Sequence, residues 1–389
     1  MRNLERVFTR TLITLAVLAA FAPAYGQEAD ADALKRPDSS VSLGVGITPG
    51  DAKDRTIWGQ YNGMREGGSH LLFDVDVNKR DDSGFWTILR GRNLGLDNRD
   101  VGLTLQQQGD WRLNAEYSEL VHREIRTINS GISGAGTTTP QIVRLAAPGA
   151  GSDLNFNLKR QSLALGGDKW ISNNLQIEVN FKSEDKNGTR MWARGYDCNA
   201  TYVCTGTQDA THQKWALIPV PEPVNFNIKQ VDAKLNFTSG KLFVTGGYYG
   251  TFFTNANGAV TPIVPNALNG PTGVLTTLNP AVAAGQFPTG GTSLQNVLQL
   301  PMALYPENQA HQFYLSGNYA WTQSTKSNFK LGYTHATQDQ SFSSMGLSGA
   351  PAGRNDLGGA LDTLLAQFNM TSRMSTNLTL LGNVRYEKR

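Results

Sequence analysis

The feature that most constrains this chain is a strict two-residue alternation of apolar and polar side chains. It is clearest in GDWRLNAEYSEL (Gly109–Leu120), where Trp111, Leu113, Ala115 and Tyr117 alternate with Arg112, Asn114, Glu116 and Ser118. A period of two is typical of a β-strand whose two faces meet different surroundings. The segment therefore predicts a sheet with one apolar side and one charged, polar side.

The same alternation recurs along the chain, in segments that approach the roughly 9–11 residues of a tilted membrane strand. The clear examples are Leu175–Lys182, Val231–Phe237, Gln312–Trp321, Asn328–Thr334 and Leu378–Glu387. Further strands are expected over Val41–Ile47, Leu71–Val77, Phe85–Arg92 and Val101–Gln107. Thr56–Tyr61 is another candidate strand. With the N-terminus in the periplasm, a full crossing by both this segment and Ser40–Ile47 would put the long loops on the periplasmic side. One of the two is therefore expected not to cross the membrane fully.

Short and long connections alternate between these strands. The short ones are expected at Gln108–Asp110, Gly167–Asn174, Thr238–Gly240, Thr322–Lys326 and Ser372–Thr376, and the long ones over 122–152, 184–222, 254–310 and 338–358. Outer-membrane barrels have this asymmetry, with short periplasmic turns and long extracellular loops.

The N-terminus carries an export signal. Arg2, Arg6 and Arg10 precede a short apolar run, Leu12–Phe21, and small residues end at Gly26. Residues 1–26 are therefore predicted to be a signal peptide, and 27–389 the barrel domain. In a soluble barrel the apolar face would point inward. Export, loop asymmetry and aromatic residues near strand ends favour a transmembrane barrel instead, with the apolar face on lipid and the polar face on the lumen.

Composition and motifs exclude several classes of function. The formal charge is +3, of which the signal segment supplies two, and no basic cluster remains for nucleic acid. The sequence contains no nucleophile-elbow, phosphate-loop or dinucleotide-binding motif. We therefore expect neither an enzyme nor a nucleic-acid-binding protein.

Eight short phrases stand out in order along the chain: SLGVG (42–46), GQYNGMREGG (59–68), GRNLGLDNRD (91–100), QGDWRLNAEYSELVH (108–122), PEPVNFNIKQVDAKLNF (221–237), GGYYGTFFTN (246–255), PENQAHQFYLSGNYAW (306–321) and THATQDQSF (334–342). Together, and in this order, they resemble the MtrB/PioB family of decahaem-associated outer-membrane barrels. Members of that family have a longer barrel, and the strand pattern here is still running at Arg389. The resemblance therefore implies that this chain is the N-terminal part of such a barrel.

The resemblance also implies a function. In that family the barrel is a sheath around a periplasm-facing multihaem c-type cytochrome, whose haems pass electrons across the outer membrane. The barrel itself is expected to bind no haem, because Cys198 and Cys204 enclose five residues and no histidine follows as c-type attachment requires. The alternative is a general diffusion porin with an open lumen and no protein plug.

The polar face is the best candidate for a functional surface. It is expected to consist of Arg112, Asn114, Glu116, Gln176, Glu178, Asn180, Lys182, Asp232, Lys234 and Asn236. These side chains would either contact the cytochrome through charges of both signs or form the hydrated wall that any wide barrel needs.

Three other features have more than one interpretation. Cys198 and Cys204 are expected to form a loop-pinning disulfide rather than a metal or redox site, since no ligand spacing surrounds them. No charged residue occurs over 242–306, and the loop within it, 254–306, either docks an extracellular cytochrome, folds into the barrel mouth, or is a mobile surface loop. The five histidines show no metal-ligand spacing, although His311 and His335 lie on neighbouring predicted strands.

Overall fold

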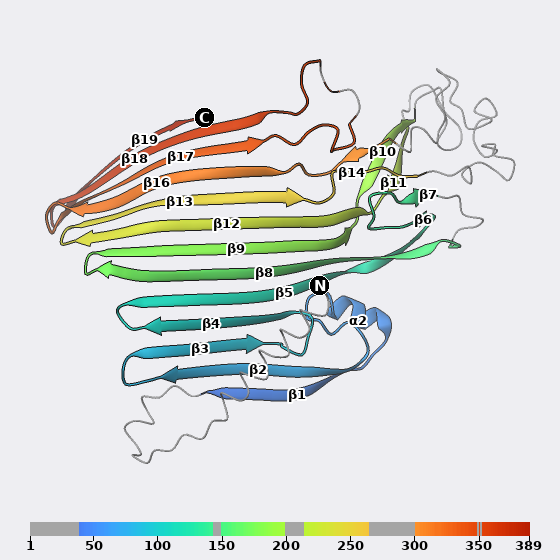
Figure 1. Cartoon of the computed structure of the whole chain (residues 1–389), viewed down its shortest axis with the longest axis horizontal. Coiled ribbons are helices and arrows are strands. Elements are labelled where there is room, and N and C mark those ends of the chain that lie inside the picture. The colour runs from blue at the N-terminus through green and yellow to red at the C-terminus, as the bar shows by residue number, and fades with distance from the viewer. Residues whose placement is uncertain (1–38, 143–148, 199–213, 264–299, 348–349, 351) are drawn as a thin grey trace, which may run out of the picture.

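A single curved antiparallel sheet dominates the computed structural model, which describes residues 39–142, 149–198, 214–263, 300–347, 350 and 352–389 (Figure 1). Its thirteen strands, each paired with the next along the chain, are β1 (Ser40–Thr48), β2 (Gly68–Arg80), β3 (Phe85–Arg92), β4 (Arg99–Gln107), β5 (Trp111–Ser130), β8 (Ser152–Ser172), β9 (Leu175–Arg190), β12 (Glu222–Ser239), β13 (Leu242–Asn255), β16 (Asn308–Ala320), β17 (Thr325–Gln338), β18 (Gly359–Ser375) and β19 (Leu378–Lys388). The predicted all-β, antiparallel fold is confirmed.

Small elements lie at one end of this sheet. Three two-stranded pairs join β6 (Ile132–Ser133) to β7 (Gln141–Ile142), β10 (Ala193–Cys198) to β11 (Lys214–Pro219), and β14 (Ala259–Val260) to β15 (Met302–Ala303). The helix α2 (Ala52–Trp58) connects β1 to β2. None of the described residues forms a helix long and apolar enough to cross a membrane.

The two ends of the sheet differ as the sequence predicts, with tight turns at one end and long connections at the other (Figure 1). Gly109 and Gly240 occupy positive φ (78° and 52°) in two of the turns, a conformation that glycine adopts without a steric penalty. In the β2–β3 turn, the Asp81 carboxylate accepts hydrogen bonds from the Ser83 hydroxyl (2.6 Å) and the Phe85 N–H (2.8 Å). These bonds hold the pKa of Asp81 below its ordinary value.

Two local expectations are wrong. Thr56–Tyr61 is not a strand: residues 52–58 are helical, and the Asp51 side chain caps this helix by accepting the Asp54 N–H at 2.8 Å. The strands are also longer than predicted. β5 continues to Ser130, where a loop was expected from His122, and β8 continues to Ser172 through most of the expected turn.

The buried apolar residues gather at the loop end of the sheet rather than in its middle. Val220, Val260, Met302 and Leu304 form one cluster, with Trp192 packed against it. Backbone hydrogen bonds join the separate long connections there: the Thr261 N–H donates to the Thr138 carbonyl at 2.8 Å, and the Leu304 N–H to Gly258 at 3.0 Å. We call this interlocked region (residues 132–142, 219–222, 256–263 and 300–307) the loop cap.

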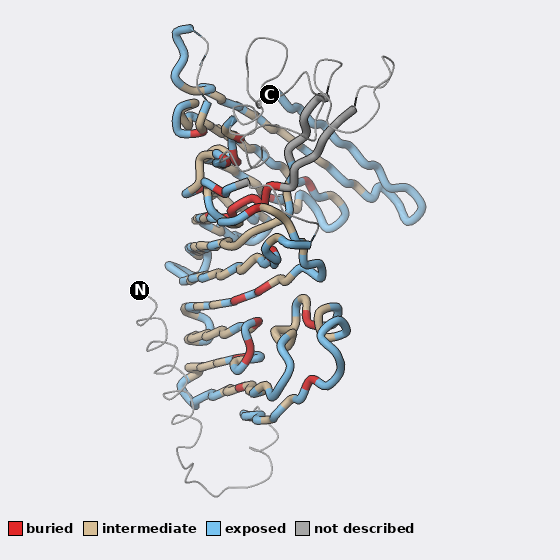
Figure 2. Tube along the Cα trace, turned by 90° about the vertical axis from the view of Figure 1, so that its right-hand side faces the viewer, coloured by how far each residue is buried: buried red, intermediate tan, exposed pale blue. Residues whose placement is uncertain are grey.

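Over the middle of the sheet, in contrast, large apolar side chains are exposed. Leu113 is 53% exposed, Val179 45% and Leu235 49%, and the described elements leave this face of β5, β9 and β12 uncovered (Figure 2). In a soluble antiparallel sheet the apolar face is the covered one. An apolar surface of this extent is typical of a face that meets lipid or a partner.

Candidate functional site

Strand register places all ten predicted site residues on one face of the sheet. Directly paired residues of an antiparallel sheet share a face. One transverse row pairs Arg112 with Asp168, Asp168 with Glu178, and Glu178 with Lys234. The next row runs from Asn114 through Gly166 and Asn180 to Asp232, and Glu116, Gln176, Lys182 and Asn236 follow by the same alternation. We call this surface the polar face.

Charges on the polar face are paired laterally, from strand to strand. Arg112 Nε donates to Asp168 Oδ2 at 2.9 Å, and Lys234 Nζ to Glu178 Oε1 at 2.9 Å. The Gln176 amide links these pairs to the next row by donating to Asp168 at 2.9 Å, and it accepts from Asn236 at 3.2 Å. A wall built in this way is densely charged yet locally close to neutral.

The remaining charged members are less completely paired. Lys182 lies 3.3 Å from Glu184, and Asp232 accepts a hydrogen bond from the Tyr314 hydroxyl at 3.1 Å. Glu116 has no ion-pair or side-chain hydrogen-bond partner within the described part of the chain. It borders a shallow hollow that opens over Ala164, where the small side chain leaves space beside Lys182.

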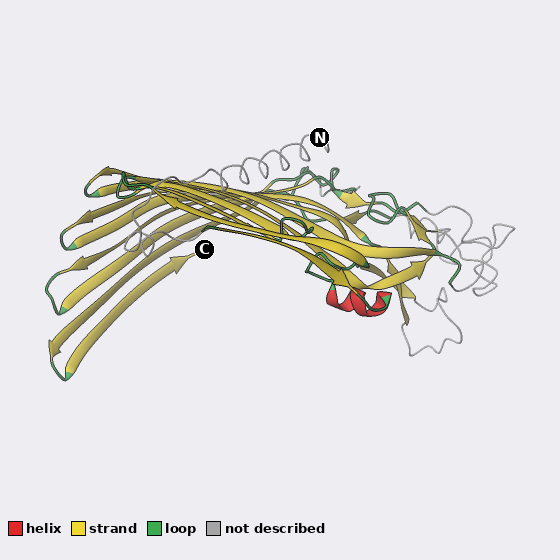
Figure 3. Cartoon of the chain, turned by 90° about the horizontal axis from the view of Figure 1, so that it is seen from below, coloured by secondary structure: helices red, strands yellow, loops and turns green. Residues whose placement is uncertain are grey.

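The polar face lies on the inner side of the curved sheet. His122 shares this face with Arg112 by alternation along β5, and its ring stacks on Tyr61 at 4.4 Å with an interplanar angle of 16°. Tyr61 is three residues beyond the end of α2 at Trp58, so α2 lies on the polar side. Figure 3 shows α2 on the inner side of the curve.

The opposite surface, which we call the apolar face, carries Trp111, Leu113, Ile177 and Val179 around a shallow apolar hollow. Aromatic rings mark the turn end of this face: Phe85 and Trp111 have centroids 6.0 Å apart, and Tyr319 and Trp321 4.7 Å apart. Towards the loop end, Tyr117 and Tyr333 lie on the same face. Two aromatic belts around an apolar band are typical of outer-membrane barrels.

Nearer the loops, the polarity of the two faces is inverted, which the sequence analysis missed. On the inner side, Leu154, Phe156, Val224 and Phe226 are buried. The Phe226 ring contacts Tyr305 of the cap, with centroids 5.9 Å apart. These strand ends follow the rule of a soluble protein, with apolar side chains inside. The available signal was the alternation in PVNFNI (223–228), whose phase is opposite to the membrane pattern.

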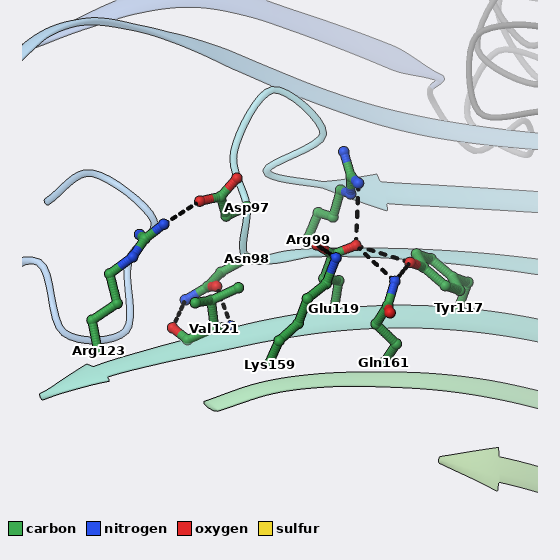
Figure 4. A network of polar contacts seen from close by, with 9 residues as sticks. All are labelled: Asp97, Asn98, Arg99, Tyr117, Glu119, Val121, Arg123, Lys159 and Gln161. Atoms are coloured by element: carbon green, nitrogen blue, oxygen red, sulfur yellow. Dashed lines mark hydrogen bonds and ion pairs between the residues drawn. The ribbon is translucent and has the colours of Figure 1, made fainter. Parts of the chain in front are cut away.

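On the outer side, the same inversion produces a polar network centred on Glu119 (Figure 4). The Glu119 carboxylate accepts from Lys159 Nζ at 2.8 Å, from Arg99 Nη2 at 3.1 Å and from the Tyr117 hydroxyl at 2.9 Å. Gln161 donates to the same Tyr117 oxygen at 3.0 Å. Glu119 follows directly after the predicted alternation, and in sequence it looks only like the end of a strand.

The other candidates have separate outcomes. Cys204 and residues 264–299 lie outside the described residues, so the Cys198–Cys204 disulfide and the role of the uncharged loop stay predictions. His311 and His335 are direct cross-strand partners. His335 Nδ1 lies 2.8 Å from Asp362, and His311 Nδ1 2.8 Å from the Tyr248 hydroxyl. Among the described residues, no group of three or more His, Cys, Asp or Glu side chains is placed to hold a metal ion.

Comparison with known proteins identifies the family. Residues 51–389 match the family described as "Putative outer membrane beta-barrel porin, MtrB/PioB". The chain is 23% identical over 364 residues to the outer membrane protein MtrB of Shewanella baltica (strain OS185), covering 90% of this chain. It spans about half the length of that relative, 46%.

Solved outer-membrane structures show a weaker likeness. OmpT of Vibrio cholerae is 11% identical, with 90% of this chain and 76% of that chain covered at a TM-score of 0.32. The FrpB iron transporter of Neisseria meningitidis is 10% identical, with 90% and 47% covered at a TM-score of 0.43. The assignment rests on the family match, which covers most of the sequence. This chain belongs to the MtrB/PioB family of outer-membrane β-barrel proteins, and it is a protein of the outer membrane.

Proposed function

We propose that this chain forms part of the wall of a barrel that sheathes a multihaem c-type cytochrome and carries it through the outer membrane. Electrons would pass along the haems of the partner, and the barrel would bind no cofactor itself. The proposal rests on the family's expected role and on one structural observation, the laterally paired polar face. That surface extends across β5, β8, β9 and β12.

The pairing pattern suits a large protein partner. Removing water from an unpaired charge is costly, whereas a charge that already has a hydrogen-bonded partner loses less when it is covered. Arg112, Glu178 and Lys234 all have such partners within the wall. The wall can therefore meet another polar surface through mixed contacts and bridging water, as wet protein interfaces do.

The apolar face suits the lipid-facing side of a sheath. Exposed Leu113, Val179 and Leu235 would contact acyl chains, and the wall between lipid and lumen would be one sheet thick. An insulating sleeve needs this division, since the conduit inside must stay separated from the bilayer. At the loops, an extracellular cytochrome is a second partner that the uncharged stretch over 254–306 would meet.

A general diffusion porin is the second candidate, favoured by the word porin in the family description. The two functions differ in their requirements. A sheath retains a haem protein and conducts electrons only when it is present. A porin passes ions and small solutes with no partner.

Reconstitution separates the two. The complete barrel, of which this chain forms part of the wall, would be co-expressed with its candidate cytochrome and incorporated into liposomes that hold a reduced dye, with an acceptor outside. A sheath is expected to co-purify with haem and to oxidise the internal dye only when both proteins are present. Dye oxidation that does not require the cytochrome, or steady ion conductance from the chain alone with no haem retained, would favour the porin.

Glu116 offers a clean variant for the same assay. Because none of the described residues forms an ion pair with it, Glu116→Lys changes a charge on the polar face and leaves the described ion pairs intact. Cytochrome retention is expected to fall several-fold, whereas a porin would show a shift in ion selectivity instead. Asp82→Lys is the matched control, since Asp82 is exposed in the β2–β3 turn, away from the polar face. Equal retention by both variants would count against cytochrome contact at this surface.

A further inference from the structure

We propose that Arg99 and Lys159 form a binding site for the phosphate group of a lipid headgroup, on the outer side of the sheet where the apolar face ends. The site uses the Glu119 network rather than the polar face. It rests on the outer-membrane location of the family and is independent of any cytochrome partner. Position, excess charge and exposure support it.

Position comes from the strand register. The transverse row through Ala115 is apolar across four strands: Ala115, Leu165, Phe181 and Val231. The row through Tyr117 is mixed, with Leu163, Ser183 and Lys229. The row through Glu119 is wholly polar, with Gln161, Asp185 and Asn227. A lipid-facing surface that changes from apolar to polar within two rows, with a tyrosine at the change, marks the headgroup level.

The network also carries an excess of positive charge. One carboxylate, Glu119, forms ion pairs with two cations: Lys159 Nζ lies 2.8 Å from Oε1, and Arg99 Nη2 lies 3.1 Å from Oε2. One cation would be enough to neutralise it. On the same face, between β17 and β18, His335 is paired one to one with Asp362. Asp185, on β9 in the same row, lies beyond Gln161 and accepts from Asn227 at 2.7 Å, and Lys229 in the next row offsets its charge. The positive charge of Arg99 and Lys159 therefore stays unbalanced over β4, β5 and β8.

The two cations of the network are more exposed than the carboxylate that they share. The Glu119 side chain is only 6% exposed, whereas Arg99 is 30% and Lys159 41% exposed. The carboxylate lies beneath the two cations and orients them, while Tyr117 and Gln161 hold it from the side (Figure 4). An anion arriving from the headgroup layer meets the two cations before it meets the carboxylate.

A phosphate group fits this geometry. Arg and Lys donate several charge-assisted hydrogen bonds to the oxygens of one phosphate, and the planar guanidinium binds two of them at once. Long extracellular loops place this end of the sheet in the outer leaflet. The ligand would therefore be a phosphorylated outer-leaflet lipid whose acyl chains lie along the apolar face towards Leu113.

Paired variants of opposite sign test the site. The full chain in detergent micelles would be titrated with diphosphorylated lipid A, and binding followed by native mass spectrometry. Lys159→Gln and Arg99→Gln are each expected to weaken binding about tenfold, as for loss of one charge-assisted hydrogen bond. Glu119→Gln removes the competing carboxylate and keeps the hydrogen-bonding shape, so it should strengthen binding. Lys330→Gln, an exposed lysine on the other face of the sheet, should have no effect.

Each alternative outcome overturns the proposal. A network with only a structural role predicts that the Glu119 variant loses lipid along with the other two. Equal binding of a dephosphorylated lipid A would exclude phosphate recognition. Inorganic phosphate that binds as tightly as the lipid would assign the site to a free anion rather than to a headgroup. Because no cytochrome is present in this assay, its result is independent of the proposed sheath function.

Discussion

Leu113→Arg tests which face of the sheet meets the lipid. Leu113 lies on the apolar face of β5, between the rings of Trp111 and Tyr117. Since a strand rises about 3.3 Å per residue, these two positions are about 20 Å apart along the strand, and Leu113 is about 3 Å from their midpoint. The substitution therefore puts a guanidinium close to the centre of the apolar band.

The expected cost has two parts. An arginine facing lipid near the midplane of a barrel costs about 2–4 kcal/mol. Loss of a half-covered leucine adds about 1 kcal/mol, half of a typical full burial. Asn114→Arg is the matched control, because the adjacent side chain lies on the polar face. Asn114 is half-buried and would lose one hydrogen bond, from the Thr104 hydroxyl at 3.0 Å, so this substitution should cost about 1 kcal/mol. The two variants should differ by about 3 kcal/mol, or roughly a hundredfold in the folding equilibrium.

Urea unfolding in phospholipid vesicles, followed by tryptophan fluorescence, would measure both free energies of unfolding. A large loss for Leu113→Arg with a small loss for Asn114→Arg is the predicted result. Equal losses would show that the two faces meet the same medium. A larger loss for Asn114→Arg would show that the polar face, and not the apolar face, meets lipid.

Three further predictions concern the loops and turns. Cys198 and Cys204 should both resist alkylation in unreduced mature protein, and two alkylated thiols by mass spectrometry would exclude the disulfide. Glu222, 2% exposed, lies 2.6 Å from Arg190 Nε, and Arg190 Nη2 donates to the Tyr305 hydroxyl of the loop cap at 2.9 Å, so this pair anchors the cap to β9 and β12. Glu222→Ala should destabilise that end by about 3 kcal/mol, the cost of leaving a largely covered cation without its partner. Faster amide exchange confined to the cap would support this prediction, and unchanged exchange would contradict it. The pKa of Asp81 is lowered in the folded protein, so its ionised carboxylate stabilises the turn. This stabilisation is fully present above the ordinary carboxyl pKa and is lost as the pH falls through the lowered pKa. The protection factor of the Phe85 amide, the ratio of its intrinsic to its observed exchange rate at the same pH, should fall at acid pH, and Asp81→Asn should abolish this pH dependence.

The alternation of apolar and polar residues was sufficient to predict the central strands and which side chains share each face of the sheet. In β5, β9 and β12 each apolar residue alternates with a polar one, so a single register places every side chain. A shift of one residue would exchange the two faces completely, which is why such segments are strongly specified. The ten residues of the polar face follow from this pattern alone.

The errors occurred where the contrast between faces disappears. Beyond Tyr117, β5 carries polar side chains on both faces, and its apolar residues, Leu120, Val121, Ile125 and Ile128, do not alternate with them. A strand without this alternation shows no two-residue period in its sequence. Thr56–Tyr61 was misjudged for a different reason: the segment is too short for its periodicity to separate helix from strand, and the Asp51 cap decides the outcome. The loop cap depends on contacts between distant segments, which local pattern does not contain.

In the proposed sheath, the polar face meets a haem protein while the apolar face meets lipid. A photoreactive amino acid placed at Glu116 or at Val179, in cells that also express the candidate cytochrome, tests both contacts. Irradiation is expected to yield a haem-staining adduct from position 116 and only lipid adducts from position 179. A haem-staining adduct from position 179, or none from position 116 despite normal barrel content in the outer membrane, would contradict the account.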